Sequence, residues 1–171
     1  MIEFADEHMV KGRATEALAA YQEAWSHMAG QLDVIQQVWL LLSIANSAIR
    51  AGDFEEAFDA LSALLEDYST SGVVIGNPLF HLLVGLCCHG LQEDPDAEVD
   101  NFARALICGG QEMFVQEDPK HLHKIKTVLE PPAETGTWDG YNGCSRDLLN
   151  GATGYLRKML TEKIGTPPPY Q

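Results

Sequence analysis

The chain has 171 residues, of which 46% are apolar, and it carries a formal net charge of −14 from 25 acidic and 11 basic side chains. This length is typical of a single domain, and this apolar content argues against a disordered chain. The excess of acid disfavours nucleic acid as a partner, because phosphate binding needs clustered Lys and Arg. No stretch approaches the roughly 20 apolar residues of a membrane span, so we expect no membrane partner either.

The acidic side chains are unevenly distributed along the chain. Residues 1–119 contain 20 acidic and four basic side chains, whereas residues 120–171 contain five and seven. Two interpretations fit this asymmetry: a well-solvated acidic surface, or a surface that attracts a basic protein partner. The sequence leaves both open.

The start of the chain and its cysteines predict the compartment. The first eight residues, Met-Ile-Glu-Phe-Ala-Asp-Glu-His, include acidic side chains and lack the basic region that opens a signal peptide. The four cysteines lack the spacing of a disulfide framework; they are Cys87, Cys88, Cys108 and Cys144. We therefore expect reduced thiols and a cytoplasmic location.

Apolar side chains recur every three or four residues through most of the chain, which predicts helices. The stripes run through residues 17–28, 34–48, 54–68, 79–86, 99–106, 122–129 and 149–160. No segment alternates apolar and polar side chains convincingly enough to be a half-buried strand. The predicted fold class is therefore all-α, with about eight helices.

Glycines and X-Pro dipeptides indicate where these helices end and begin. Gly12, Gly52 and Gly90 each follow an apolar stripe, as a left-handed C-cap residue does. New helices are expected after four side chains that can cap an N-terminus, three of which precede a proline; they are Asp53, Asn77, Asp94 and Asp118. The Gly- and Pro-rich segment 131–143 predicts a longer loop.

The same glycines indicate a repeat. Gly52 lies 40 residues after Gly12, and Gly90 lies 38 residues after Gly52. Ala17 and Ala57 each stand five residues after their glycine, where a small side chain lets two helices approach closely. We predict a single domain at 1–165, with helix hairpins at 1–30, 34–68 and 77–108, capping helices at 118–130 and 144–164, and a flexible Pro-rich tail at 166–171. The last helix is expected to cover the apolar face of the third hairpin.

Two segments resemble the turn and second helix of a tetratricopeptide repeat (TPR): Lys11-Gly-Arg-Ala-Thr-Glu-Ala-Leu-Ala-Ala-Tyr-Gln-Glu-Ala and Arg50-Ala-Gly-Asp-Phe-Glu-Glu-Ala-Phe. The segment Leu82-Leu-Val-Gly-Leu-Cys-Cys resembles a first helix of that family. The resemblance covers residues 1 to about 108 and implies a short right-handed solenoid of three degenerate repeats. The spacing exceeds the family's usual period of about 34 residues, and the proline that ends a repeat is missing from the first two.

This resemblance also implies a groove that binds a protein partner. The side chains it directs toward the groove are Asp6, Trp39, Asn46, Arg50 and His89. A tryptophan in a groove is a typical binding hot spot, although Trp39 could equally pack between hairpins. Some TPR proteins grip a terminal carboxylate with Lys, Asn and Arg. Asp6 stands where an Asn is wanted, so we expect no binding of such carboxylates.

Two aromatic residues of the predicted loop, Trp138 and Tyr141, complete the candidate partner-binding residues. Aromatic side chains in Gly-rich loops often recognise a partner. They also often pin a loop to its own domain, and both interpretations remain open.

The sequence offers little catalytic or metal-binding chemistry. The tract Cys87-Cys88-His89 lies on one predicted helix, where adjacent side chains point about 100° apart and rarely bind one ion together. We interpret its cysteines as buried packing residues. His121 and His123 lack further ligands at recognisable spacing, so we expect an exposed pair. We therefore predict no metal, no cofactor and no enzymatic activity.

A second resemblance concerns the expected function. The segments Arg104-Ala-Leu-Ile-Cys-Gly-Gly-Gln-Glu-Met-Phe and Glu117-Asp-Pro-Lys-His-Leu resemble the end of small bacterial repeat proteins, several of which act as immunity partners of secreted antibacterial toxins. This implies a non-catalytic immunity protein that binds one basic toxin domain and blocks it sterically. The alternatives are a TPR-type secretion chaperone or adaptor that binds an extended client segment, and a thiol enzyme that uses Cys144.

Overall fold

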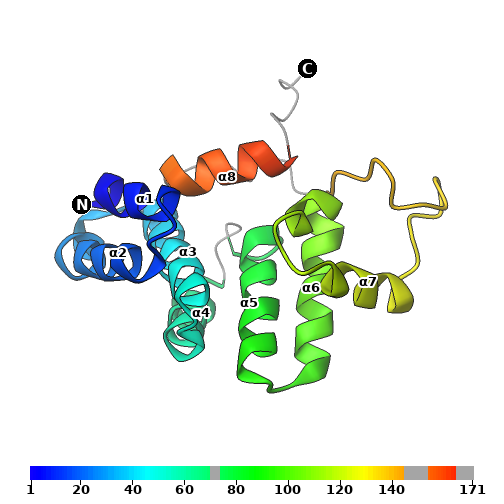
Figure 1. Ribbon diagram of the computed structural model, residues 1–171, viewed down its shortest axis with the longest axis horizontal. Coiled ribbons are helices and arrows are strands. Elements are labelled where there is room, and N and C mark those ends of the chain that lie inside the picture. Colours follow the sequence, from blue (N-terminus) through cyan, green and yellow to red (C-terminus); the bar gives the residue numbers. More distant parts are fainter. Residues whose placement is uncertain (70–73, 145–153, 165–171) are drawn as a thin grey trace.

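The computed structural model describes residues 1–69, 74–144 and 154–164. Over these residues the chain forms eight α-helices, two short 3₁₀-helices and no strand (Figure 1), which confirms the all-α prediction. In chain order the elements are α1 (Ile2–Val10), α2 (Ala14–Met28), η1 (Ala29–Gln31), α3 (Val34–Ala51), α4 (Phe54–Tyr68), α5 (Pro78–Leu91), α6 (Pro95–Gly109), η2 (Gln111–Phe114), α7 (Pro119–Val128) and α8 (Gly154–Ile164).

All four N-terminal caps expected from the sequence form. In each, a side-chain oxygen accepts a hydrogen bond from a first-turn backbone N–H at 3.0–3.2 Å; the capping residues are Asp53, Asn77, Asp94 and Asp118. Asp33 adds a capping box at α3, in which it exchanges side-chain-to-backbone hydrogen bonds with Gln36. These bonds satisfy N–H groups that no carbonyl within the helix can reach.

Two of the three glycines expected at helix ends behave as predicted. Gly12 and Gly52 have φ angles of +69° and +82°, in the left-handed region that commonly follows a helix. Gly90 instead lies inside α5, and the left-handed residue after that helix is Gln92, with φ 56°. A Cβ atom at Gly90 would lie 2.3 Å from the ring of Phe54. The prediction that Gly90 ends a helix is wrong, because this glycine makes room for α4 to pack on α5.

Each helix from α1 to α6 packs on the next one along the chain (Figure 1). The division into hairpins at 1–30, 34–68 and 77–108 stays a prediction. α3 also contacts α5, and every residue from Val38 to Ile49 is buried. A helix that is buried on all sides forms the centre of a core. The TPR character of the arrangement stays a prediction.

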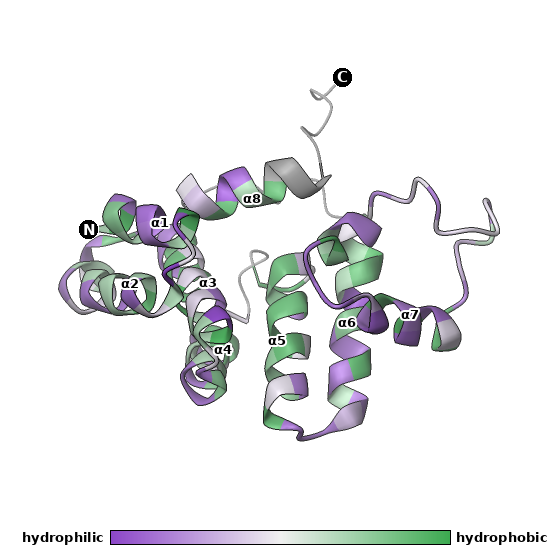
Figure 2. Cartoon of the chain, viewed as in Figure 1, coloured by the Kyte–Doolittle hydropathy of each residue, from purple (hydrophilic) through white to green (hydrophobic). Residues whose placement is uncertain are grey.

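Small residues allow the close packing of these helices. Ala17 and Ala57, which the repeat pattern singled out, are both fully buried. Gly85 on α5 faces the ring of Phe102 on α6, and a Cβ atom there would lie 2.5 Å from that ring. Figure 2 shows that α5 is apolar along most of its length, whereas α6 mixes apolar and hydrophilic residues. α5 is therefore the inner helix of this pair.

The last helix joins two distant parts of the chain. α8 packs on α1 and on η2 (Figure 1), and its side chains Leu156 and Leu160 are fully buried. We expected this helix to cover the apolar face of the third hairpin; in the described residues it packs mainly on α1 and η2 instead. The predicted helix over 144–164 and the tail at 166–171 include residues 145–153 and 165–171, which lie outside the described residues.

The contact at Gly85 generates a test of the α5–α6 packing. We expect Gly85→Ala to lower the free energy of unfolding by about 1–3 kcal/mol, because a new Cβ overpacks against Phe102. The gain in helix propensity, about 1 kcal/mol, offsets only part of this loss. Urea unfolding measures the change. Gly30→Ala is the control, since no atom lies within 4 Å of a Cβ placed there. Equal stability of both variants would contradict the packing described.

Candidate functional site

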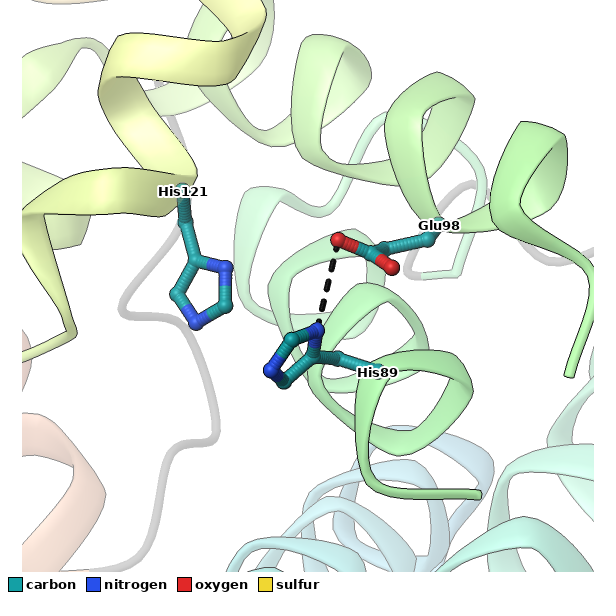
Figure 3. A group of neighbouring side chains, drawn as sticks. All are labelled: His89, Glu98 and His121. Atoms are coloured by element: carbon teal, nitrogen blue, oxygen red, sulfur yellow. Dashed lines mark ion pairs between the residues drawn. The ribbon is translucent and has the colours of Figure 1, made fainter. Parts of the chain in front are cut away.

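Three side chains that can bind a metal ion meet where α5, α6 and α7 come together (Figure 3). His89 lies near the end of α5, Glu98 near the start of α6, and His121 in the first turn of α7. Their ligand atoms all lie within 4.8 Å of one another. We call these residues the His–Glu cluster. Among the described residues, this cluster is the group in which at least three His, Cys, Asp or Glu side chains lie close enough together to hold one metal ion.

Local structure explains how the cluster forms. A short turn at residues 92–94 reverses the chain between α5 and α6, so His89 and Glu98 face each other across that turn. Asp94 and Asp118 cap α6 and α7, and a proline follows each at the first helical position. The caps therefore determine which turn of each helix carries the cluster residue.

Glu98 is the electrostatic centre of the cluster. Its side chain is only 10% exposed, and its Oε1 atom lies 3.5 Å from Nδ1 of His89 and 3.3 Å from Nζ of Lys124. A carboxylate that is removed from water needs such partners to remain ionised. Lys124 projects from α7, one turn after His121, and so provides the cluster's ammonium group.

His121 is the most buried member of the cluster. The residue is 4% exposed, and its ring packs against the rings of His89 and Phe102, both with centroids 4.7 Å away. Burial lowers the pKa of His121, and the nearby His89 lowers it further. At neutral pH the imidazole is therefore uncharged and has a lone pair available.

The structure places two of the predicted partner-binding residues in the core. Trp39 is 1% exposed and Asn46 is also buried, so neither faces an open groove. Both belong to α3, which is surrounded by other helices. The expectation that they point toward a groove is wrong. The alternative interpretation, that Trp39 packs between hairpins, agrees with its burial.

Two further predicted residues make internal contacts. Arg50 pairs with the largely buried carboxylate of Glu117, through contacts of 2.6 and 3.2 Å, and so joins the end of α3 to the segment before α7. Asp6 is half-buried and accepts a hydrogen bond of 2.6 Å from the hydroxyl of Tyr21. Both charged groups thus hold the fold together.

The aromatic loop residues pack on their own chain. Trp138 is buried and meets Tyr141 edge to face, with ring centroids 5.3 Å apart. The hydroxyl of Tyr141 donates a 2.6 Å hydrogen bond to the carbonyl of Ile107, and the side-chain amide of Gln111 donates to the carbonyl of Trp138. These contacts agree with the interpretation that the aromatic residues pin the loop.

Of the predicted partner-binding residues, only His89 belongs to the His–Glu cluster. Sequence reasoning missed Glu98, which looked like one more acid on a helix surface. It described His121 and His123 as an exposed pair, and that is wrong for His121, although His123 is exposed. One feature of the sequence could have pointed to Glu98 and His121. Each lies near the start of a helix, α6 or α7, that begins with an Asp-Pro dipeptide.

Cys144 lies beside another thiol. Burial, and next to it the neighbouring thiol of Cys144, raises the pKa of Cys108 to about 11. A raised pKa keeps a thiol protonated and weakly nucleophilic at neutral pH. Cys87 is buried as expected, and its thiol donates to the carbonyl of Phe54 at 3.2 Å.

A second feature lies on the outward side of α4. Phe58 and Leu65 are 52% and 50% exposed, although both are large apolar side chains. They stand seven residues apart, on one face of the helix. The acidic residues Glu55, Asp59 and Glu66 are exposed on the same side of α4. We call these five residues the α4 face.

Known proteins provide no guide to either feature. No family model, curated protein or solved structure matches this chain. The resemblance to TPR proteins therefore stays a prediction. None of the helices in the described part of the chain combines the length and apolar character needed to span a bilayer.

The environment of His121 predicts a pH dependence of stability. Its pKa in the folded chain lies below the usual value of about 6.5. Between these two values the unfolded chain binds more protons, so the free energy of unfolding falls as the pH is lowered through that window. His81, whose pKa is also lowered by burial, acts in the same direction. Urea unfolding at a series of pH values measures the slope. We expect His121→Gln to flatten it in part; an unchanged slope would show that the folded chain does not depress this pKa.

Proposed function

We propose that the chain is a non-catalytic binding protein that captures one protein partner with a basic surface. The observation that carries the proposal is the α4 face, where two half-exposed apolar side chains lie among three exposed carboxylates. Apolar side chains supply binding energy once water is excluded from them. Surrounding carboxylates select a partner of opposite charge and repel acidic ones.

The overall charge supports the same proposal. Residues 1–119, which include α1 to α6, contain 20 acidic and four basic side chains. Most of these acids are exposed. A field of one sign over such a surface accelerates the approach of a basic partner and becomes weaker as salt is added.

The specific role that we propose is that of an immunity protein. It would bind a basic toxin domain and cover its active site or block the entry of substrate, without modifying it. The resemblance of residues 104–122 to small bacterial immunity partners motivates this role. Four cysteines without disulfide bonds support a cytoplasmic location, where such a toxin would be neutralised.

One observation favours the alternative of a secretion chaperone or adaptor. A hollow of about 560 Å³ lies between η2 and α7, and its walls include Phe114, Val115 and Leu122 together with Lys126. An extended client segment could place apolar side chains in such a hollow. A short client peptide that binds as tightly as the whole partner would favour the chaperone, and a requirement for a folded domain would favour the immunity protein.

The α4 face can be tested with matched variants. The partner is first isolated by pull-down and mass spectrometry from cells that express the chain. We expect Phe58→Ala and Leu65→Ala together to weaken its binding by about 2 kcal/mol or more in surface plasmon resonance, because both side chains are removed from a central contact. Thr15→Ala and Ala19→Ser together, on the exposed side of α2, are the control and are expected to leave affinity unchanged. Full affinity of the Phe58/Leu65 variant would exclude the α4 face.

The electrostatic part has its own test. We expect the association rate with the isolated partner to fall steeply as salt is raised, while the dissociation rate changes little. Stopped-flow mixing at several ionic strengths measures both rates. An association rate that is insensitive to salt would contradict steering by the acidic surface.

For the immunity role, expression of the partner alone should arrest growth, and co-expression with this chain should restore it.

A further inference from the structure

We propose that His89, Glu98 and His121 bind a divalent transition-metal ion such as Zn²⁺, through one nitrogen of each imidazole and one carboxylate oxygen. The site does not depend on the proposed partner or on the α4 face. Two histidines and one carboxylate are a ligand set that Zn²⁺ and related ions accept in proteins, with the remaining coordination positions occupied by water.

The spacing of the ligand atoms supports this assignment. Metal–ligand bonds of about 2.0–2.1 Å place neighbouring ligand atoms roughly 3.4 Å apart in a tetrahedral shell. Nδ1 of His89 and Oε1 of Glu98 are already 3.5 Å apart. All three ligand atoms lie within 4.8 Å, so the longest separation must close by about 1.4 Å at most. The His89 side chain is 42% exposed, and therefore has room to make that movement.

The three ligands come from three different helices, which distinguishes the cluster from a chance run of polar residues (Figure 3). His121 reaches the cluster from a buried position, with its ring supported by Phe102. A ligand whose ring is held by packing loses little freedom when it binds an ion. Burial also favours the uncharged imidazole that metal binding requires.

Lys124 is the competitor for the same carboxylate oxygen. Its ammonium lies 3.3 Å from Oε1 of Glu98, and a cation bound by Glu98 would repel it. The Lys124 side chain is 46% exposed, so it can turn toward water when an ion binds. The rival explanation of the cluster is an ion-pair network of His89, Glu98 and Lys124 that binds no metal. The two explanations differ in whether the chain binds zinc saturably through His89 and Glu98.

Other charged groups around the cluster are mostly acidic. Glu93 and Asp94 act on Cys88 next to His89, while Asp118 and Lys120 act on His121. With Glu98 and Lys124 included, carboxylates outnumber ammonium groups here, which favours a divalent cation. A bound ion would join α7 to the α5–α6 pair and so stabilise the chain against unfolding.

The test is calorimetric titration of the full chain with zinc chloride at neutral pH, after treatment with a chelator that is then removed. We expect one ion per chain. His89→Ala and Glu98→Gln should each weaken binding about tenfold or more, because each removes a direct ligand. Lys124→Gln should strengthen it, because the competing ammonium is gone. His89 is partly exposed, so its variant is expected to fold, as circular dichroism can verify.

His123→Ala is the matched control, because His123 lies on α7 two residues after His121 and is exposed. We expect it to retain zinc affinity within about twofold. Absence of saturable binding would overturn the proposal. So would binding that is unaffected by His89→Ala and Glu98→Gln, or binding that His123→Ala weakens as much as they do. Lys124→Gln without any gain in affinity would show that the ion is not held by the Glu98 oxygen that the ammonium contacts, and would overturn the assigned ligand set.

Cobalt replaces zinc in a second measurement, because the four free cysteines offer thiolates that could also bind zinc. The visible spectrum of the Co²⁺ form should show the d–d bands of nitrogen and oxygen ligands. It should lack the intense near-ultraviolet band of cobalt bound to sulfur, and Cys88→Ser should leave it unchanged. A sulfur band that disappears in a cysteine variant would overturn the assigned ligand set.

Discussion

The burial of α3 is the constraint on which the rest of the structure depends. Twelve consecutive residues of α3, 38–49, are buried. The other helices must therefore cover α3 on all sides. Its polar side chains conform to that position: the hydroxyls of Ser43 and Ser47 donate to carbonyls of the preceding turn at 2.8 Å. The charged side chains therefore lie mainly on the outer helices, and most of the acidic ones are exposed at the surface.

The two proposals rest on different residues and can fail separately. Recognition of a partner depends on exposed apolar and acidic side chains of α4, where nothing needs to be positioned with great accuracy. Metal binding depends on three ligand atoms that the packing of α5, α6 and α7 holds close together. The contact of Phe54 with Gly90 links α4 to the end of α5, close to His89. Both features are thus built on the same framework of packed helices.

Features that depend on near neighbours in sequence were predictable. The caps formed because an Asp or Asn side chain needs only the next two or three backbone N–H groups. The left-handed conformation of Gly12 and Gly52 at helix ends was predictable for the same reason. The role of Gly90 inside α5 was not predictable, because the ring that leaves no room for a side chain there belongs to Phe54 on another helix, α4. The cluster was missed likewise: His89 and His121 are 32 positions apart in sequence, and the interval between them gives no recognisable ligand spacing.

Periodicity, capping residues and net charge were therefore enough to establish an all-helical chain with an acidic exterior, since each is a local or summed property of the sequence. Only the packed structure decided which face of each helix is covered. It turned Trp39 and Asn46 inward, committed Arg50 to Glu117, and brought two imidazoles to one carboxylate. The physical reason is that helical spacing defines a stripe of side chains, whereas their neighbours depend on how separate helices cross.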